Sequence, residues 1–126
     1  MTLRLNPAKF FGREYHRRNY NCWDFIREVW LDAGGVDIGH RTPESCTSEG
    51  FRRAFAEQEQ DIDGKLVFRI KEPEEPCLVM LLRPGVMSHV GVYTRGRLFH
   101  LHQRKGVVME PLAVAALGYN EVRFYK

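Results

Sequence analysis

The sequence predicts a single-domain α+β protein in which helices come first and an antiparallel sheet follows. Apolar residues between positions 22 and 33 recur at helical spacing, and short apolar segments separated by tight turns fill positions 77 to 125. Helices and strands are therefore segregated along the chain, which favours an α+β arrangement over an alternating parallel fold. At 126 residues, the chain is expected to form one domain, residues 1–126, that needs neither disulfides nor metal to fold.

The best-defined element is a helix expected to begin at Cys22. Apolar or aromatic residues stand at positions 22, 23, 26, 29 and 30, the spacing of a helix with one buried face. Asn21 suits the N-cap, and Asp24 gives a weak version of a capping box, which usually has Glu or Gln at that position. The helix is expected to end after about three turns at Ala33-Gly34-Gly35, where glycine can adopt the left-handed cap conformation.

The other elements follow from periodicity and turn residues. After a loop over residues 36–47, a second helix is expected from Ser48 to about Gln60, then a strand over 65–70 and a charged linker over 71–76. Strands are expected at 77–82, 88–94, 97–102 and 107–109, with turns at 84–85 and 95–96. Pro111 is expected to open a short helix through Leu117, and residues 121–125 to form a last strand.

Composition excludes few classes of protein. The formal net charge is +3, from 19 basic and 16 acidic residues, which fits anionic surroundings such as a cell wall but does not indicate nucleic-acid binding. No run of 18 apolar residues predicts a membrane span, and the first residues lack the features of a secretory signal. We therefore expect a protein made in the cytoplasm without a signal peptide.

The cysteines indicate reduced thiols. Their number is odd, at the scattered positions 22, 46 and 77, and no CxxC pair is present. Cys22 is the most interesting of the three, because the unpaired N–H groups and positive dipole at a helix start favour the nucleophilic thiolate. The alternative is that Cys22 is a small apolar residue in a core helix.

Three histidines in the strand half could serve such a thiolate. Alternation places His89 on the face of its strand opposite Val90 and Val92, so that His89 faces outwards if the valines are in the core. The same rule puts His100 and His102 on one face of the next strand, and a hairpin at residues 95–96 would bring His89 near one of them. Periodicity does not choose between the two.

Other interpretations of these histidines remain open. Each could be a structural residue on its strand. Together they could bind a metal ion, although no carboxylate or cysteine is recognisable beside them and Cys22 would then have no partner. We expect no metal and no cofactor.

The residues carry a resemblance to a known family. Asn21-Cys22-Trp23-Asp24-Phe25 at a helix start, followed by His89-Val-Gly-Val-Tyr93, Gly96-Arg-Leu-Phe-His100 and Gly106-Val-Val, resembles the NlpC/p-sixty superfamily of cysteine peptidases. The similarity covers about residues 11–113. The serine that usually follows the cysteine in this family is replaced by Trp23, and a Cys-Trp sequence resembles the phage tail-associated members.

The resemblance implies a fold and a set of roles. The fold would be papain-like, with the catalytic helix packed on a C-terminal antiparallel sheet. Cys22 would be the nucleophile, His89 the general base and His100 the orienting third residue, whereas His102 has no counterpart. A family tyrosine that stabilises the oxyanion would correspond to Tyr15 or to its rival Tyr20, with the backbone N–H of Cys22 as the other donor.

The implied activity is hydrolysis of the peptide stems of bacterial peptidoglycan. We expect a peptidoglycan peptide as substrate, phage tail proteins as partners, and action at the cell wall as part of a virion or secreted assembly. Two alternatives stay open. One is a related Cys-His amidase or acyl transferase, and the other is a structural component of a phage tail tip in which catalysis is incidental.

Overall fold

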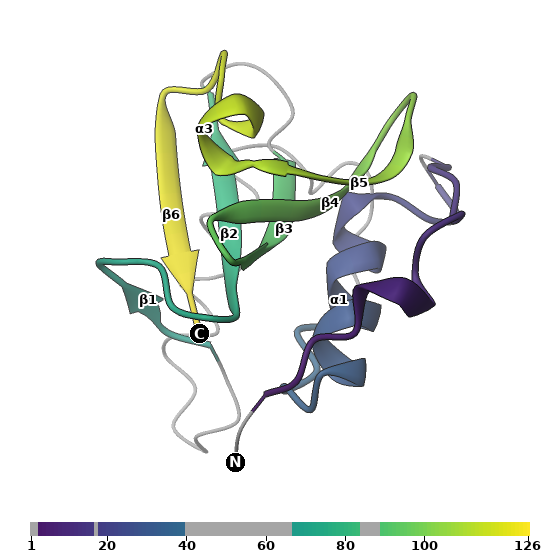
Figure 1. Ribbon diagram of the computed structural model, residues 1–126, viewed down its shortest axis with the longest axis horizontal. Helices are drawn as coiled ribbons and strands as arrows, with labels where there is room; N and C mark the ends of the chain where they lie inside the picture. Colours follow the sequence, from purple (N-terminus) through teal and green to yellow (C-terminus); the bar gives the residue numbers. More distant parts are fainter. Residues whose placement is uncertain (1–2, 17, 40–66, 84–88) are drawn as a thin grey trace.

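The computed structural model describes residues 3–16, 18–39, 67–83 and 89–126. These residues form a small α+β fold (Figure 1) with a 3-10 turn η1 (Pro7–Lys9), helix α1 (Cys22–Asp32), a short helix α3 (Leu112–Ala115) and six strands. The strands are β1 (Arg69–Ile70), β2 (Cys77–Leu82), β3 (His89–Thr94), β4 (Arg97–His102), β5 (Gly106–Pro111) and β6 (Glu121–Tyr125). No helix in these ranges has the length and apolar character required to cross a membrane.

The strands form one antiparallel sheet in the order β1-β6-β2-β3-β4-β5. The strands predicted over 77–82, 97–102 and 121–125 are confirmed. Residues 89–94 of the strand predicted over 88–94 are confirmed too, and residue 88 lies outside the described residues. The turn between β3 and β4 has positive φ at both Arg95 and Gly96, the backbone of a tight hairpin that follows the twist of its strands. The last strand of the chain lies between β1 and β2, inside the sheet rather than at its edge.

Helix α1 begins and ends as predicted. The Asn21 side chain accepts hydrogen bonds from the backbone N–H groups of Trp23 and Asp24, and the Asp24 carboxylate accepts from the N–H of Asn21. This is a complete capping box, so the aspartate serves as well here as the more usual Glu. At the other end, the Gly35 N–H bonds Trp30 and Gly34 has a φ of +98°, the left-handed cap that glycine allows.

The C-terminal third differs from the prediction in two places. Strand β5 is longer than 107–109 because it pairs with β4 along its whole length, ending with Arg97 opposite Pro111. Pro111 is accordingly the N-cap of α3 and not its first residue, and α3 ends at Ala115 instead of Leu117. Outside this third, strand β1 covers residues 69–70 of the strand predicted over 65–70, of which residues 65–66 lie outside the described residues. The predicted helix 48–60, the turn 84–85 and Cys46 lie outside the described residues.

Two apolar clusters cover the two faces of the sheet. The larger contains Val90, Val92, Phe99 and Leu101 and packs against α1, which lies along β3 and β4. The smaller, around Val79, Leu81 and Leu98, is covered by α3 and the residues that follow it. The predicted alternation is therefore correct, but the face that carries His89 is partly covered and His89 is half-buried.

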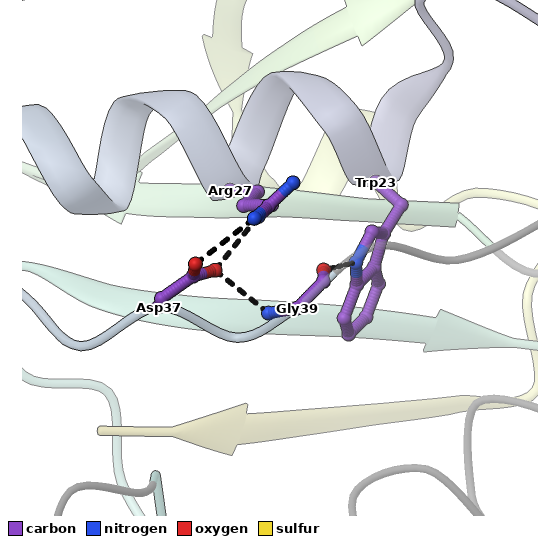
Figure 2. A network of polar contacts seen from close by, with 4 residues as sticks. All are labelled: Trp23, Arg27, Asp37 and Gly39. Atoms are coloured by element: carbon purple, nitrogen blue, oxygen red, sulfur yellow. Dashed lines mark hydrogen bonds and ion pairs between the residues drawn. The ribbon is translucent and has the colours of Figure 1, made fainter.

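A polar network fastens residues 36–39 to α1 (Figure 2). Arg27 binds Asp37 through two nitrogen atoms at 2.7 and 2.9 Å, and Asp37 also accepts a hydrogen bond from the backbone of Gly39. The Trp23 indole N–H donates to the Gly39 carbonyl at 2.6 Å. The hydrogen bonds to Asp37, first those from Arg27 and then that from Gly39, lower its pKa to about 2. The network fixes Trp23, the neighbour of Cys22, from outside the helix.

Candidate active site

A cavity of about 470 Å³ lies where the start of α1 meets the sheet. Its lining comes from four parts of the chain: the segment before α1, the start of α1, the strands β3 to β5, and α3 with the residues after it. Five of the six residues singled out from the sequence line it, namely Tyr15, Cys22, His89, His100 and His102. The structure thus brings residues separated by up to 87 positions in the sequence (102 minus 15) to one cavity.

Cys22 is the first residue of α1 and opens the cavity from the helix side. It is 3% exposed, and the Asn21 cap fixes the backbone of the first turn around it. The partial positive charge at a helix start favours a thiolate there. Cys77, the other cysteine in the described residues, is on the buried strand β2, where burial raises its thiol pKa to about 11. The two thiols are therefore in contrasting environments.

His89 and His100 form a direct pair beside the cavity. His89 Nε2 lies 2.7 Å from His100 Nδ1, and the two rings meet edge to face. Burial, and then the charges of His100 and His102, lower the pKa of His89 far below its usual value. Burial is also the main cause that lowers the pKa of His100. Burial thus disfavours the charged form, and both rings are neutral near pH 7.

His102 lines the same cavity but has a different task. Its Nδ1 accepts hydrogen bonds from the backbone N–H groups of Arg104 and Lys105, at 3.0 and 3.2 Å. It thereby holds the turn between β4 and β5. Of the two histidines that periodicity left open, the structure places His100, and not His102, in hydrogen-bond contact with His89.

The three rings do not converge on a point where a metal ion could sit. His89 and His100 direct nitrogen atoms at each other, and one nitrogen of His102 is used by the β4–β5 turn. Within the described ranges, no group of three His, Cys, Asp or Glu side chains has a suitable arrangement.

The two candidate tyrosines are placed differently. Tyr15 lines the cavity with Cys22 and His89. Tyr20 is not among the described residues that line it, and its hydroxyl donates to Glu28 at 2.7 Å. Burial and this bond to Glu28 raise the pKa of Tyr20. Tyr20 therefore fastens the segment before α1 to the helix itself.

Glu110 and Tyr119 are among the lining residues of the cavity that sequence reasoning missed. Glu110 Oε1 lies 2.9 Å from His100 Nε2, so it extends the histidine pair to a chain of three side chains. A prediction of β5 that extended to residue 111 would have pointed to Glu110. His100 pairs with Val108, and Glu110, two residues further along β5, lies on the same face of the sheet as both. Tyr119 is close enough for the negative charge of Cys22 to add to burial in raising its pKa. Its position after α3 gave no signal.

Comparisons of the chain with protein-family models, with curated proteins and with solved structures found no significant match.

Proposed function

We propose that the chain is a papain-like cysteine peptidase of the NlpC/p-sixty type, which hydrolyses peptide stems of bacterial peptidoglycan. The observation that carries the proposal is the meeting of a helix-start cysteine with a hydrogen-bonded histidine pair at one cavity. A nucleophile, a base and a group that orients the base are the three parts that acyl transfer through a thiol requires. The resemblance of the cysteine and histidine segments to this family supports the choice of substrate.

We assign the roles of His89 and His100 from the ring nitrogens that are already hydrogen-bonded. His89 Nε2 is engaged with His100, so Nδ1 is the nitrogen that remains for the thiol of Cys22. His100 holds the ring of His89 from behind, as the third residue of a catalytic triad does. His89 is neutral at pH 7 because its pKa is lowered, so its Nδ1 has a lone pair for the thiol proton. The negative charge that Cys22 gains on losing this proton favours the protonated ring.

The reaction follows from these roles. His89 Nδ1 takes the proton of the Cys22 thiol, and the sulfur attacks the carbonyl carbon of the scissile amide. The protonated His89 then gives its proton to the leaving amine as the C–N bond breaks, which leaves a thioester on Cys22. Water attacks the thioester after giving a proton to His89, and this proton returns to the sulfur as the C–S bond breaks.

The negative charge that develops on the substrate oxygen needs donors. We assign the backbone N–H of Cys22, at the start of α1, and the hydroxyl of Tyr15 as these donors, because both groups belong to the lining of the cavity. Such donors stabilise the transition state more than the ground state.

The proposed setting is the cell wall, reached as part of a virion or a secreted assembly with phage tail proteins as partners. The formal net charge of +3 favours an anionic polymer weakly. The Cys-Trp sequence, with Trp23 directly after Cys22, is the feature that supports the phage tail-associated type.

The deciding experiment compares Cys22→Ala with Cys77→Ala on purified sacculi. We expect Cys22→Ala to lower the release of stem-peptide fragments by at least about a thousandfold, because no other group replaces the nucleophile. Cys77→Ala is the matched control, since Cys77 is a buried thiol on β2 and its loss should leave the activity per folded molecule unchanged. Undiminished release by Cys22→Ala, with wild-type circular dichroism, would exclude the proposed peptidase.

Product analysis separates the related reactions. Mass spectrometry of digested muropeptides distinguishes a cut within the stem from an amidase cut between the sugar lactate and L-alanine. A tail-tip component without catalysis would release neither product, and its Cys22 would react with iodoacetamide no faster at pH 7 than an ordinary thiol does.

A further inference from the structure

The chain of hydrogen bonds through the two histidines continues beyond the three proposed catalytic residues. His100 Nδ1 faces His89, and His100 Nε2 lies 2.9 Å from Glu110 Oε1. His100 is 3% exposed and the Glu110 side chain 26% exposed, so water competes little for the nitrogen that faces the glutamate. Both nitrogens of His100 are consequently used by protein groups.

We propose that Glu110 is a positioning residue that sets the tautomers of both histidines and thereby directs the basic nitrogen of His89 towards Cys22. This inference rests on the proposed function only for its consequence in catalysis, because the tautomers themselves are properties of the free protein.

Glu110 sets the direction of the hydrogen bonds. A carboxylate can only accept hydrogen bonds. His100 must therefore carry its proton on Nε2, and since the ring is neutral, its Nδ1 can only accept. The partner of Nδ1, His89 Nε2, must then be the donor. The only lone pair left on the neutral His89 ring is on Nδ1, the nitrogen that receives the thiol proton in the proposed cycle.

Without Glu110, nothing fixes which ring donates in the hydrogen bond between His89 and His100. His100 could then carry its proton on Nδ1 and donate to His89 Nε2, which would place the proton of His89 on Nδ1. A His89 ring in that tautomer cannot accept a proton from Cys22 at that nitrogen. The carboxylate has a second effect. A protonated His89 would still donate through Nε2 to His100, and the negative charge of Glu110, at the far end of this series of hydrogen bonds, stabilises the imidazolium.

The test uses variants of Glu110 in the full chain. Glu110→Leu removes the acceptor, Glu110→Asp keeps a carboxylate, and Glu110→Gln keeps the shape without the charge. Glu121→Gln is the matched control, because Glu121 is a glutamate on β6 that pairs with Arg123 and does not line the cavity. Circular dichroism verifies that each variant is folded, and Glu110→Ala, which also removes the acceptor, serves if the leucine variant is not.

The first readout is the long-range ¹H–¹⁵N spectrum of histidine-labelled protein at pH 7. We expect His89 and His100 to carry their protons on Nε2 in the wild type, in Glu110→Asp and in Glu121→Gln, and His89 to gain a proton on Nδ1 in Glu110→Leu. The second readout is alkylation of Cys22 by iodoacetamide at pH 7, which should slow at least about tenfold in Glu110→Leu and recover within about threefold in Glu110→Asp.

The outcomes separate the two proposals. Unchanged tautomers and alkylation rates in a folded Glu110→Leu or Glu110→Ala variant would overturn the positioning role of Glu110. The expected spectra together with a wild type that is inactive on sacculi would refute the proposed peptidase and leave the role of Glu110 standing.

Discussion

The side chains of His89 and His100 meet edge to face, with His89 Nε2 2.7 Å from His100 Nδ1, although they stand on neighbouring strands eleven residues apart in the sequence. The paired register of β3 and β4 runs from Thr94 and Arg97 as far as Val92 and Phe99. The histidine pair lies beyond it, next to the start of α1. Both rings line the cavity together with Cys22.

His100 and His102 should respond differently to substitution. His100→Ala removes the group that holds His89, so we expect turnover to fall about a hundredfold or more. His102→Ala removes an acceptor for two backbone N–H groups of the β4–β5 turn, so we expect a loss of about 1 kcal/mol in stability and a turnover within a few-fold of wild type. Turnover on muropeptides and urea unfolding measure the two effects. The reverse pattern would make His102 the third residue.

The two tyrosines form a second matched pair. Tyr15→Phe should lower turnover about a hundredfold, since a hydroxyl at the cavity is lost that we assign to the oxyanion. Tyr20→Phe should instead cost about 1 kcal/mol of stability, because it removes the hydrogen bond to Glu28. Equal turnover in both variants would exclude Tyr15 as an oxyanion donor.

The lowered pKa of His89 predicts destabilisation by mild acid. The folded-state pKa of His89 is depressed, so the unfolded chain binds the proton first and stability falls with pH below the unfolded value of about 6.5. The contribution of the neutral His89 to the free energy of unfolding is fully present above that pH. Below it, the protein loses about 1.4 kcal/mol of stability for each pH unit on account of one such histidine. Wild type should therefore lose about 2 kcal/mol between pH 6.5 and pH 5 on account of His89.

Urea unfolding at pH 7, 6 and 5 measures this dependence. We expect His89→Gln to show a shallower fall than wild type over the same range, because glutamine does not titrate. Parallel curves for the two proteins would mean that His89 is not held neutral in the folded state.

Gly91 should be required for close packing behind the histidine pair. A Cβ at this position would lie 2.6 Å from Leu98 Cδ1 and 3.0 Å from His100 Cβ, so Gly91→Ala must push β4 away. We expect a loss of about 1 to 3 kcal/mol, typical of overpacking. Adding Leu98→Ala makes room for the methyl group, so the double variant should be more stable than the sum of the two single changes predicts. Strict additivity would contradict a steric cause.

Prediction from the sequence succeeded where the determining forces are local. Helix α1 has a capping box at Asn21 and Asp24 and a glycine cap at Gly34. Each cap involves residues within one turn of each other, so the residue types predict where the helix begins and ends. Prediction failed at Pro111, which suits the first turn of a helix equally well as the end of a strand. Pairing of β5 with β4 decided that question.

By itself, the sequence determined that Cys22 opens a helix and that His89 is on the face of its strand opposite Val90, because capping and alternation depend only on neighbouring residues. The tertiary structure alone decided which ring His89 contacts, and it added Glu110 to the chain. The reason is geometric. Which side chains meet across strands depends on strand order, register and the point where pairing ends, and these are set by packing of the whole sheet.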